Sequence, residues 1–93
     1  SDPYHKVRFA NWNLNVGMES AEAGNFQAAI YYHANGINFL GGHLWVEETY
    51  NLCLGLHEGA AFASYALGKT SAALQYAGAI VDNVPFEDSL VAQ

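Results

Sequence analysis

The sequence lacks several features that would assign it to a common class of protein. It has one cysteine, Cys53, so no disulfide can form within the chain. Small extracellular domains usually depend on disulfides, so the lone thiol favours a reducing, cytoplasmic compartment. No apolar run approaches the ~20 residues of a membrane-spanning helix, and the N-terminal residues lack the apolar core of a signal peptide.

Basic residues are also scarce. Lys6, Arg8 and Lys69 stand against nine acidic residues, which gives a net charge of −6. Phosphate backbones and anionic lipid headgroups would repel such a surface. We therefore expect neither nucleic acid nor a membrane as a partner.

Hydrophobic residues are plentiful, and their spacing indicates helices. They make up 52% of the 93 residues, enough for one packed domain. They recur every three or four positions, and no stretch alternates long enough for a strand, so we predict an all-α fold. The expected helices cover about 4–23, 26–40, 44–67 and 70–83, forming hairpin 1 (about 4–40) and hairpin 2 (about 44–83) in a single unit 1–93, with 86–93 as the start of a fifth helix.

Particular residues are expected to shape the first hairpin. Phe9, Trp12 and Val16 would face inward from its first helix. Gly24 would end that helix in the left-handed conformation, and the Asn25 side chain would cap the next one. The inner stripe of the second helix would contain Phe26, Ala29, Ile30, His33, Ile37 and Leu40.

The second hairpin begins with the longest expected helix, 44–67, which Trp45 would anchor to the core. Gly55 and Gly59 lie on one face of it and would let a neighbouring helix approach closely. Gly68 would end this helix, and Thr70 or Ser71 would cap the next. The inner stripe of that last helix would contain Ala73, Leu74, Ala77, Ile80 and Val81, with Pro85 ending it.

The two hairpins resemble each other in sequence. Gly24 and Gly68 occupy equivalent turns 44 residues apart, and a period of that size with two helices per unit is typical of an α-solenoid. The pattern resembles the tetratricopeptide repeat (TPR), although Thr70 replaces its aromatic residue, the first unit lacks a closing proline and the period is about ten residues longer than usual. The matching positions are Gly17, Gly24, Phe26, Ala29 and Gly36 in the first unit, and Ala61, Gly68, Ala73 and Pro85 in the second.

This long-period form is similar to the helical-repeat region that follows the ATPase module in large AAA- or STAND-type signalling proteins with kinase, GAF or cyclase domains. The resemblance implies a cytoplasmic, non-catalytic scaffold or protein-interaction segment, without a cofactor, in a longer polypeptide. It also implies that ATPase and kinase residues lie elsewhere. A free-standing α-helical domain that binds a peptide or a small apolar ligand is the alternative. In isolation, exposed apolar ends would make the 93-residue chain self-associate.

Two short motifs resemble catalytic ones but are incomplete. Gly68-Lys69-Thr70 could end a phosphate-binding loop, but that motif needs a glycine where Ala63 stands, and a strand before it. His57-Glu58 could belong to a zinc protease motif, but the second histidine would be residue 61, which is alanine.

Three further chemical possibilities are no stronger. Cys53 with His57, and His43 with Glu47, each share a helical face, but a structural zinc needs four ligands. Glu58 follows His57 directly and points away from it, so it cannot orient the imidazole for an attack by Cys53. The remaining hydroxyl candidates for a nucleophile are Ser64, Thr70 and Ser71. We therefore expect no enzyme activity.

The tyrosines are the remaining candidates for a functional surface. In a solenoid they could line a concave peptide-binding face, or they could fill gaps between helices with their hydroxyls at the rim, which is the commoner role. The candidate interaction residues are Tyr31, Tyr32, Tyr50, Tyr65 and Tyr76, with His33 in the same aromatic set.

Overall fold

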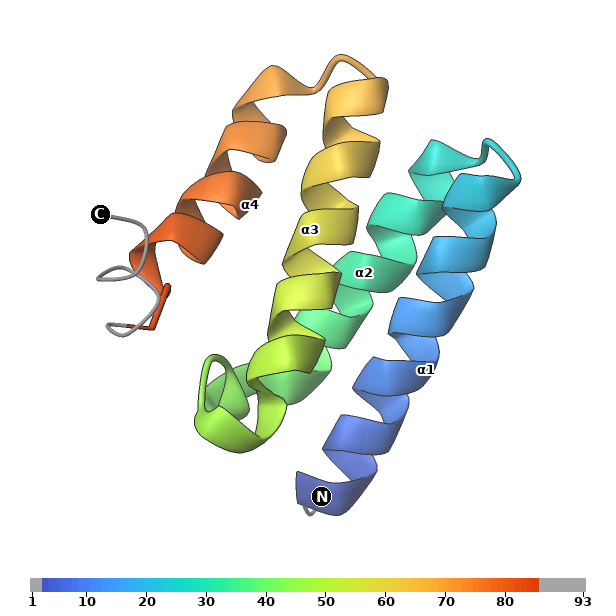
Figure 1. Cartoon of the computed structure of the whole chain (residues 1–93). Helices are drawn as coiled ribbons and strands as arrows, with labels where there is room; N and C mark the ends of the chain where they lie inside the picture. The colour runs from blue at the N-terminus through green and yellow to red at the C-terminus, as the bar shows by residue number, and fades with distance from the viewer. Residues whose placement is uncertain (1–2, 86–93) are drawn as a thin grey trace.

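The computed structural model describes residues 3–85 and is all-α within that range. Helices α1 and α2 form the first hairpin and α3 and α4 the second (Figure 1). Helix α3 contacts both α1 and α2, whereas α4 packs mainly on α3. The elements are α1 (Pro3–Glu22), α2 (Phe26–Leu40), the short 3-10 helices η1 (Gly41–His43) and η2 (Glu47–Thr49), α3 (Tyr50–Ala66) and α4 (Thr70–Asp82).

The inward face of α1 consists of small residues. Ala10, Asn13 and Gly17 are buried, whereas Phe9 and Trp12 are more than half exposed. The expectation that Phe9 and Trp12 face the core is therefore wrong. Small side chains allow α2 and α3 to come close to α1, which leaves the larger residues on the outer side of the helix.

Close approach of three helices defines the centre of the molecule. A Cβ added at Gly36 of α2 would lie 2.6 Å from Leu56 Cδ2 of α3 and 3.3 Å from the Ala10 carbonyl oxygen of α1. Only glycine fits there without displacing a neighbour. Leu56 is fully buried in the core cluster with Ala10, Leu40 and Cys53.

Both hairpin turns have the same structure. Gly24 and Gly68 have φ of 81° and 76°, the left-handed conformation expected for each. The residue after each glycine donates its N–H to a serine carbonyl five positions back, Asn25 to Ser20 and Lys69 to Ser64, both at 2.8 Å. The turn thus recurs at an offset of 44 residues.

The caps that follow these turns differ. The Asn25 side chain accepts a hydrogen bond from the Ala28 N–H at 3.1 Å, as predicted. Helix α4 begins directly at Thr70, its N-cap is Lys69, and Lys69 makes no side-chain cap bond. The prediction that Thr70 or Ser71 caps α4 is therefore wrong, because both lie inside the helix.

The segment between the hairpins is not part of α3. That helix begins at Tyr50 rather than near residue 44, after η1, an extended residue Leu44 and η2. Trp45 has φ of 62°, which is uncommon for a bulky residue and breaks any continuous helix. Its backbone N–H donates to Cys53 Sγ at 3.2 Å, which fixes the segment against α3.

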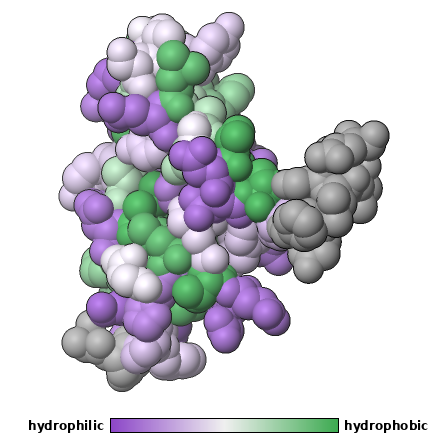
Figure 2. All heavy atoms as spheres, turned by 90° about the vertical axis from the view of Figure 1, so that its left-hand side faces the viewer, coloured by the Kyte–Doolittle hydropathy of each residue, from purple (hydrophilic) through white to green (hydrophobic). Residues whose placement is uncertain are grey.

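Helix α4 is the least covered of the four. It contains no fully buried residue, and Leu74 and Val81, which were expected to face inward, are 67% and 70% exposed. Figure 2 looks at this side of the molecule and shows hydrophobic side chains at its surface. The predicted fifth helix, 86–93, lies outside the described residues.

Across residues 3–85, no helix is both long and apolar enough to span a membrane.

Candidate docking groove on the first hairpin

A groove of about 660 Å³ opens on the outer side of the first hairpin. We call it the α1/α2 groove. Its walls are largely aromatic, since the side chains that α1 turns away from the core meet those of α2. It is lined by His5, Arg8, Phe9, Trp12 and Asn13 of α1 and by Tyr31, Tyr32, Asn35 and Phe39 of α2.

Ring contacts hold the aromatic walls in place. Phe9 stacks on Phe39 with centroids 5.4 Å apart. Trp12 meets Tyr32 edge to face at 6.2 Å, and Tyr32 meets Tyr31 in the same way at 5.3 Å. These pairs prearrange the groove, so an apolar partner would have fewer side chains to immobilise on binding.

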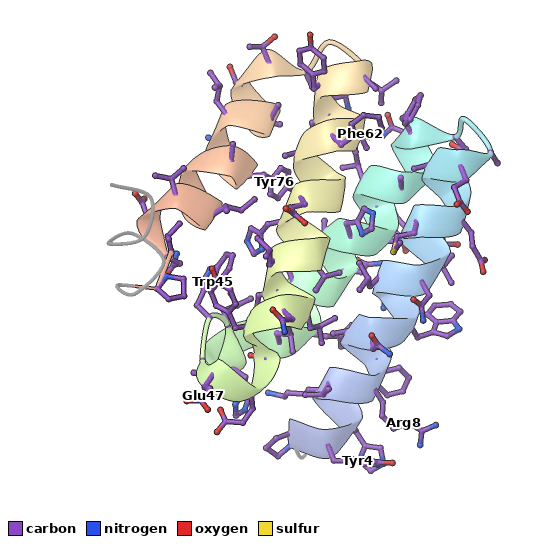
Figure 3. All side chains as sticks on the ribbon, viewed as in Figure 1. Tyr4, Arg8, Trp45, Glu47, Phe62 and Tyr76 are labelled. Atoms are coloured by element: carbon purple, nitrogen blue, oxygen red, sulfur yellow. The ribbon has the colours of Figure 1, made fainter. Side chains whose placement is uncertain are left out.

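Polar groups lie beside the aromatic surface. Asn13 is 3% exposed, and its Nδ2 donates to the Phe9 carbonyl oxygen at 2.8 Å, which fixes its amide at the base of the groove. Arg8 stacks over the Tyr4 ring at 5.7 Å (Figure 3). With Lys6 nearby in sequence, two of the three basic residues of the chain belong to the first two turns of α1.

The five candidate tyrosines do not form one surface. Tyr31 and Tyr32 line the α1/α2 groove. Tyr50 and Tyr76 have ring contacts in the second hairpin, Tyr50 with Trp45 and Tyr76 with His57. Tyr65 is 75% exposed on α3.

The two motif-like sequences occupy structural positions. The Lys69 N–H is bonded to the Ser64 carbonyl oxygen within the hairpin turn, so it does not point to an open phosphate site. His57 is buried, and its Nδ1 donates to the Cys53 carbonyl oxygen at 2.7 Å, whereas Glu58 is exposed. Among residues 3–85, His, Cys, Asp and Glu nowhere form a group of three that could hold a metal ion.

Another buried histidine, His33, lies between two helices that each present a glycine. A Cβ added at Gly17 of α1 would lie 2.6 Å from His33 Cε1, and one at Gly59 of α3 would overlap His33 Nε2. The imidazole is 1% exposed, and burial lowers its pKa below the usual value of 6.5. His33 therefore acts as a neutral packing residue.

Searches of protein-family models, curated proteins and solved structures found no match to this chain.

Of the aromatic residues of the groove, only Tyr31 and Tyr32 are predicted from the sequence as interaction residues. Phe9 and Trp12 fit a helical stripe, which predicts a place in the core. Ala10, Asn13 and Gly17 follow the same helical spacing, and that row of small residues was the signal that indicated the buried face.

Proposed function

We propose that this chain is a non-catalytic, α-solenoid-type segment that binds other proteins, within a larger ATPase-containing signalling protein of the cytoplasm. The observation that carries the proposal is the recurrence of the hairpin. Turn geometry, backbone hydrogen bonds and an internal side-chain bond all repeat at 44 residues. That side-chain bond joins Asn13 to the Phe9 carbonyl in the first hairpin and His57 to the Cys53 carbonyl in the second.

The faces of the two hairpins support a role in stacking and docking. Cys53 and Leu56 of α3, the counterparts of Phe9 and Trp12, are fully buried against the first hairpin. The same face of α1 and α2 forms the open aromatic groove. The first hairpin therefore leaves uncovered the face that the second hairpin buries, and such an apolar face is suited to packing against a helix or segment of another protein.

A second function is favoured by the groove itself. A pocket of this volume with aromatic walls and a few fixed polar groups also suits a peptide or a small apolar ligand in a free-standing domain. The two functions differ in what surrounds the chain in its gene.

The test is to read the gene on both sides of these 93 codons. The scaffold proposal expects further helix pairs near the 44-residue period and an ATPase module before them. A start codon directly upstream and a stop codon directly downstream would contradict it and favour the free-standing domain.

A further inference from the structure

We propose that the α1/α2 groove binds a segment of a separate protein that presents a tryptophan side chain followed by acidic residues. This inference rests on the proposed interaction role and specifies its partner. The evidence comes from the second hairpin, where such a segment of this same chain contacts Cys53 and His57, the counterparts of two residues that line the groove.

In the second hairpin, Trp45 packs against α3 (Figure 3). Its ring lies 4.7 Å from the His57 ring and 5.5 Å from the Tyr50 ring, and its backbone N–H donates to Cys53 Sγ. The Tyr76 ring of α4 also contacts the His57 ring, edge to face at 6.1 Å.

The same positions in the first hairpin line the open groove. Phe9, Asn13 and Tyr32 are 44 residues before Cys53, His57 and Tyr76, and all three line the groove. Trp12 and Tyr31 stay more than half exposed there. The first hairpin therefore presents, in an open groove, the counterparts of two residues that Trp45 contacts in the second, Cys53 and His57.

The filling segment of the second hairpin also has a characteristic charge. Trp45 is followed, after Val46, by Glu47 and Glu48. In Figure 3, Glu47 lies below Trp45 at the turn before α3, and Arg8, which lines the groove, lies on the first turns of α1. Arg8 at the groove, with Lys6 nearby in sequence, complements carboxylates on a bound segment, whereas the net negative charge of the chain as a whole would repel them.

These observations favour a tryptophan–acidic segment over other apolar partners. The indole supplies the apolar area that the aromatic walls leave uncovered, and tryptophan is enriched among the residues that dominate binding energy. The carboxylates place the segment in one direction, toward the basic turns of α1. The segment 41–49 of this chain has the same chemistry and provides a probe.

The experiment titrates the ¹⁵N-labelled 93-residue protein with the synthetic peptide GGHLWVEET and follows its two tryptophan indole N–H signals by NMR. We expect the Trp12 signal to shift and saturate while the Trp45 signal stays in place. Replacing the peptide tryptophan by alanine should raise the dissociation constant about tenfold or more. Replacing both peptide glutamates by glutamine should weaken binding about two- to fivefold, and less at high salt.

Variants of the protein locate the site. Trp12→Ala and Tyr31→Ala remove exposed groove walls and should each weaken peptide binding about tenfold. Tyr65→Ala removes an even more exposed aromatic residue outside the groove and should leave the dissociation constant unchanged. Circular dichroism checks that all three variants keep the wild-type helix content.

Three results would overturn the proposal. A shift of the Trp45 signal alone would mean that the peptide displaces the chain's own segment, and equal binding of the alanine peptide would mean that the tryptophan is not recognised. A protein dimer that Trp12→Ala abolishes would assign the groove to a second copy. Absence of peptide binding together with further repeats in the gene would reject the partner and leave the scaffold function standing. Peptide binding without such repeats would reject the scaffold and leave the groove assignment standing.

Discussion

At the scale of single residues, His33 decides how closely three helices approach. Its ring fills the space that Gly17 of α1 and Gly59 of α3 leave open, and its Nδ1 has no hydrogen-bond partner among the described residues. Such a site favours a neutral imidazole, because a charged ring would lose its water there without gaining a counter-charge. Stability should therefore depend on pH through this one group.

Lowering the pH from 7.5 to 5.5 should destabilise the protein through His33. Its folded-state pKa is depressed by burial, so the unfolded chain takes up the proton first, and the stabilisation present above about pH 6.5 is lost as the pH falls below that value. Urea unfolding at both pH values measures the change. The variant His33→Gln, which cannot titrate at this position, should show a smaller loss, and an identical loss in both proteins would contradict the assignment.

The close packing of Gly59 on His33 predicts that two helix-interior glycines, Gly59 and Gly78, respond differently in stability to substitution by alanine. Gly59→Ala should lower the free energy of unfolding by about 1–3 kcal/mol, because the new methyl group overlaps the buried ring of His33. Gly78→Ala in α4 meets no atom within 4 Å and should instead raise it by up to about 1 kcal/mol through helix propensity. Chemical denaturation compares the two, and equal effects would mean that α3 does not pack on His33 as described.

At the scale of elements, the two hairpins have the same turn geometry but differ in whether a side chain caps the helix that follows the turn. Asn25 and Lys69 have nearly the same backbone angles, φ and ψ of −92° and 78° for Asn25 and −86° and 73° for Lys69. Only Asn25 uses its side chain to cap the helix that follows. The N-terminus of α4 therefore lacks a bond that its backbone geometry already permits.

Transferring the cap should stabilise the second hairpin. Lys69→Asn should raise the free energy of unfolding by about 1 kcal/mol, because an asparagine at these angles can accept from the N–H of residue 72. The substitution also removes the long, exposed contact of Lys69 Nζ with Gln27 Oε1, which contributes little. Thermal unfolding provides the measurement.

The first hairpin provides the matched control for this prediction. Asn25→Ala should lower the free energy of unfolding by about 1 kcal/mol, since it deletes the cap hydrogen bond that Asn25 already makes. A destabilised Lys69→Asn protein would show that the two turns are not equivalent in energy.

At the scale of the whole molecule, exposed apolar surface favours self-association and the net acidic charge opposes it. Helix α4 packs mainly on α3 and exposes Leu74 and Val81, so it offers a surface for association. The net charge of −6 keeps copies apart at low ionic strength. The balance between these two terms should set the oligomeric state.

Raising the salt concentration from about 20 mM to about 500 mM should therefore promote self-association, because screening shortens the range of the repulsion and leaves the apolar attraction. Sedimentation velocity at matched protein concentrations measures the effect. The double variant Leu74→Gln with Val81→Gln should suppress it, whereas Trp12→Ala should not. Association that weakens with salt would point to ionic contacts instead.

Local signals in the sequence determined the helices and their turns. The spacing of apolar residues predicted an all-α chain, Gly24 and Gly68 marked two turns that prove alike, and Asn25 was identified as a cap. These features depend on interactions within a few residues, which the sequence shows directly. The solenoid assembly and the ATPase context remain predictions.

Only the tertiary structure decided which side of each helix faces the core. Phe9 and Trp12 fit an inner stripe by hydrophobicity, yet they form the outer groove, because the close helix crossings accept only Ala10, Asn13 and Gly17. The start of α3 likewise depended on Trp45, whose strained backbone is held by contacts with Cys53, Tyr50 and His57. Hydrophobic periodicity ranks residues by how well burial would stabilise them, whereas packing selects those whose size fits the space between helices.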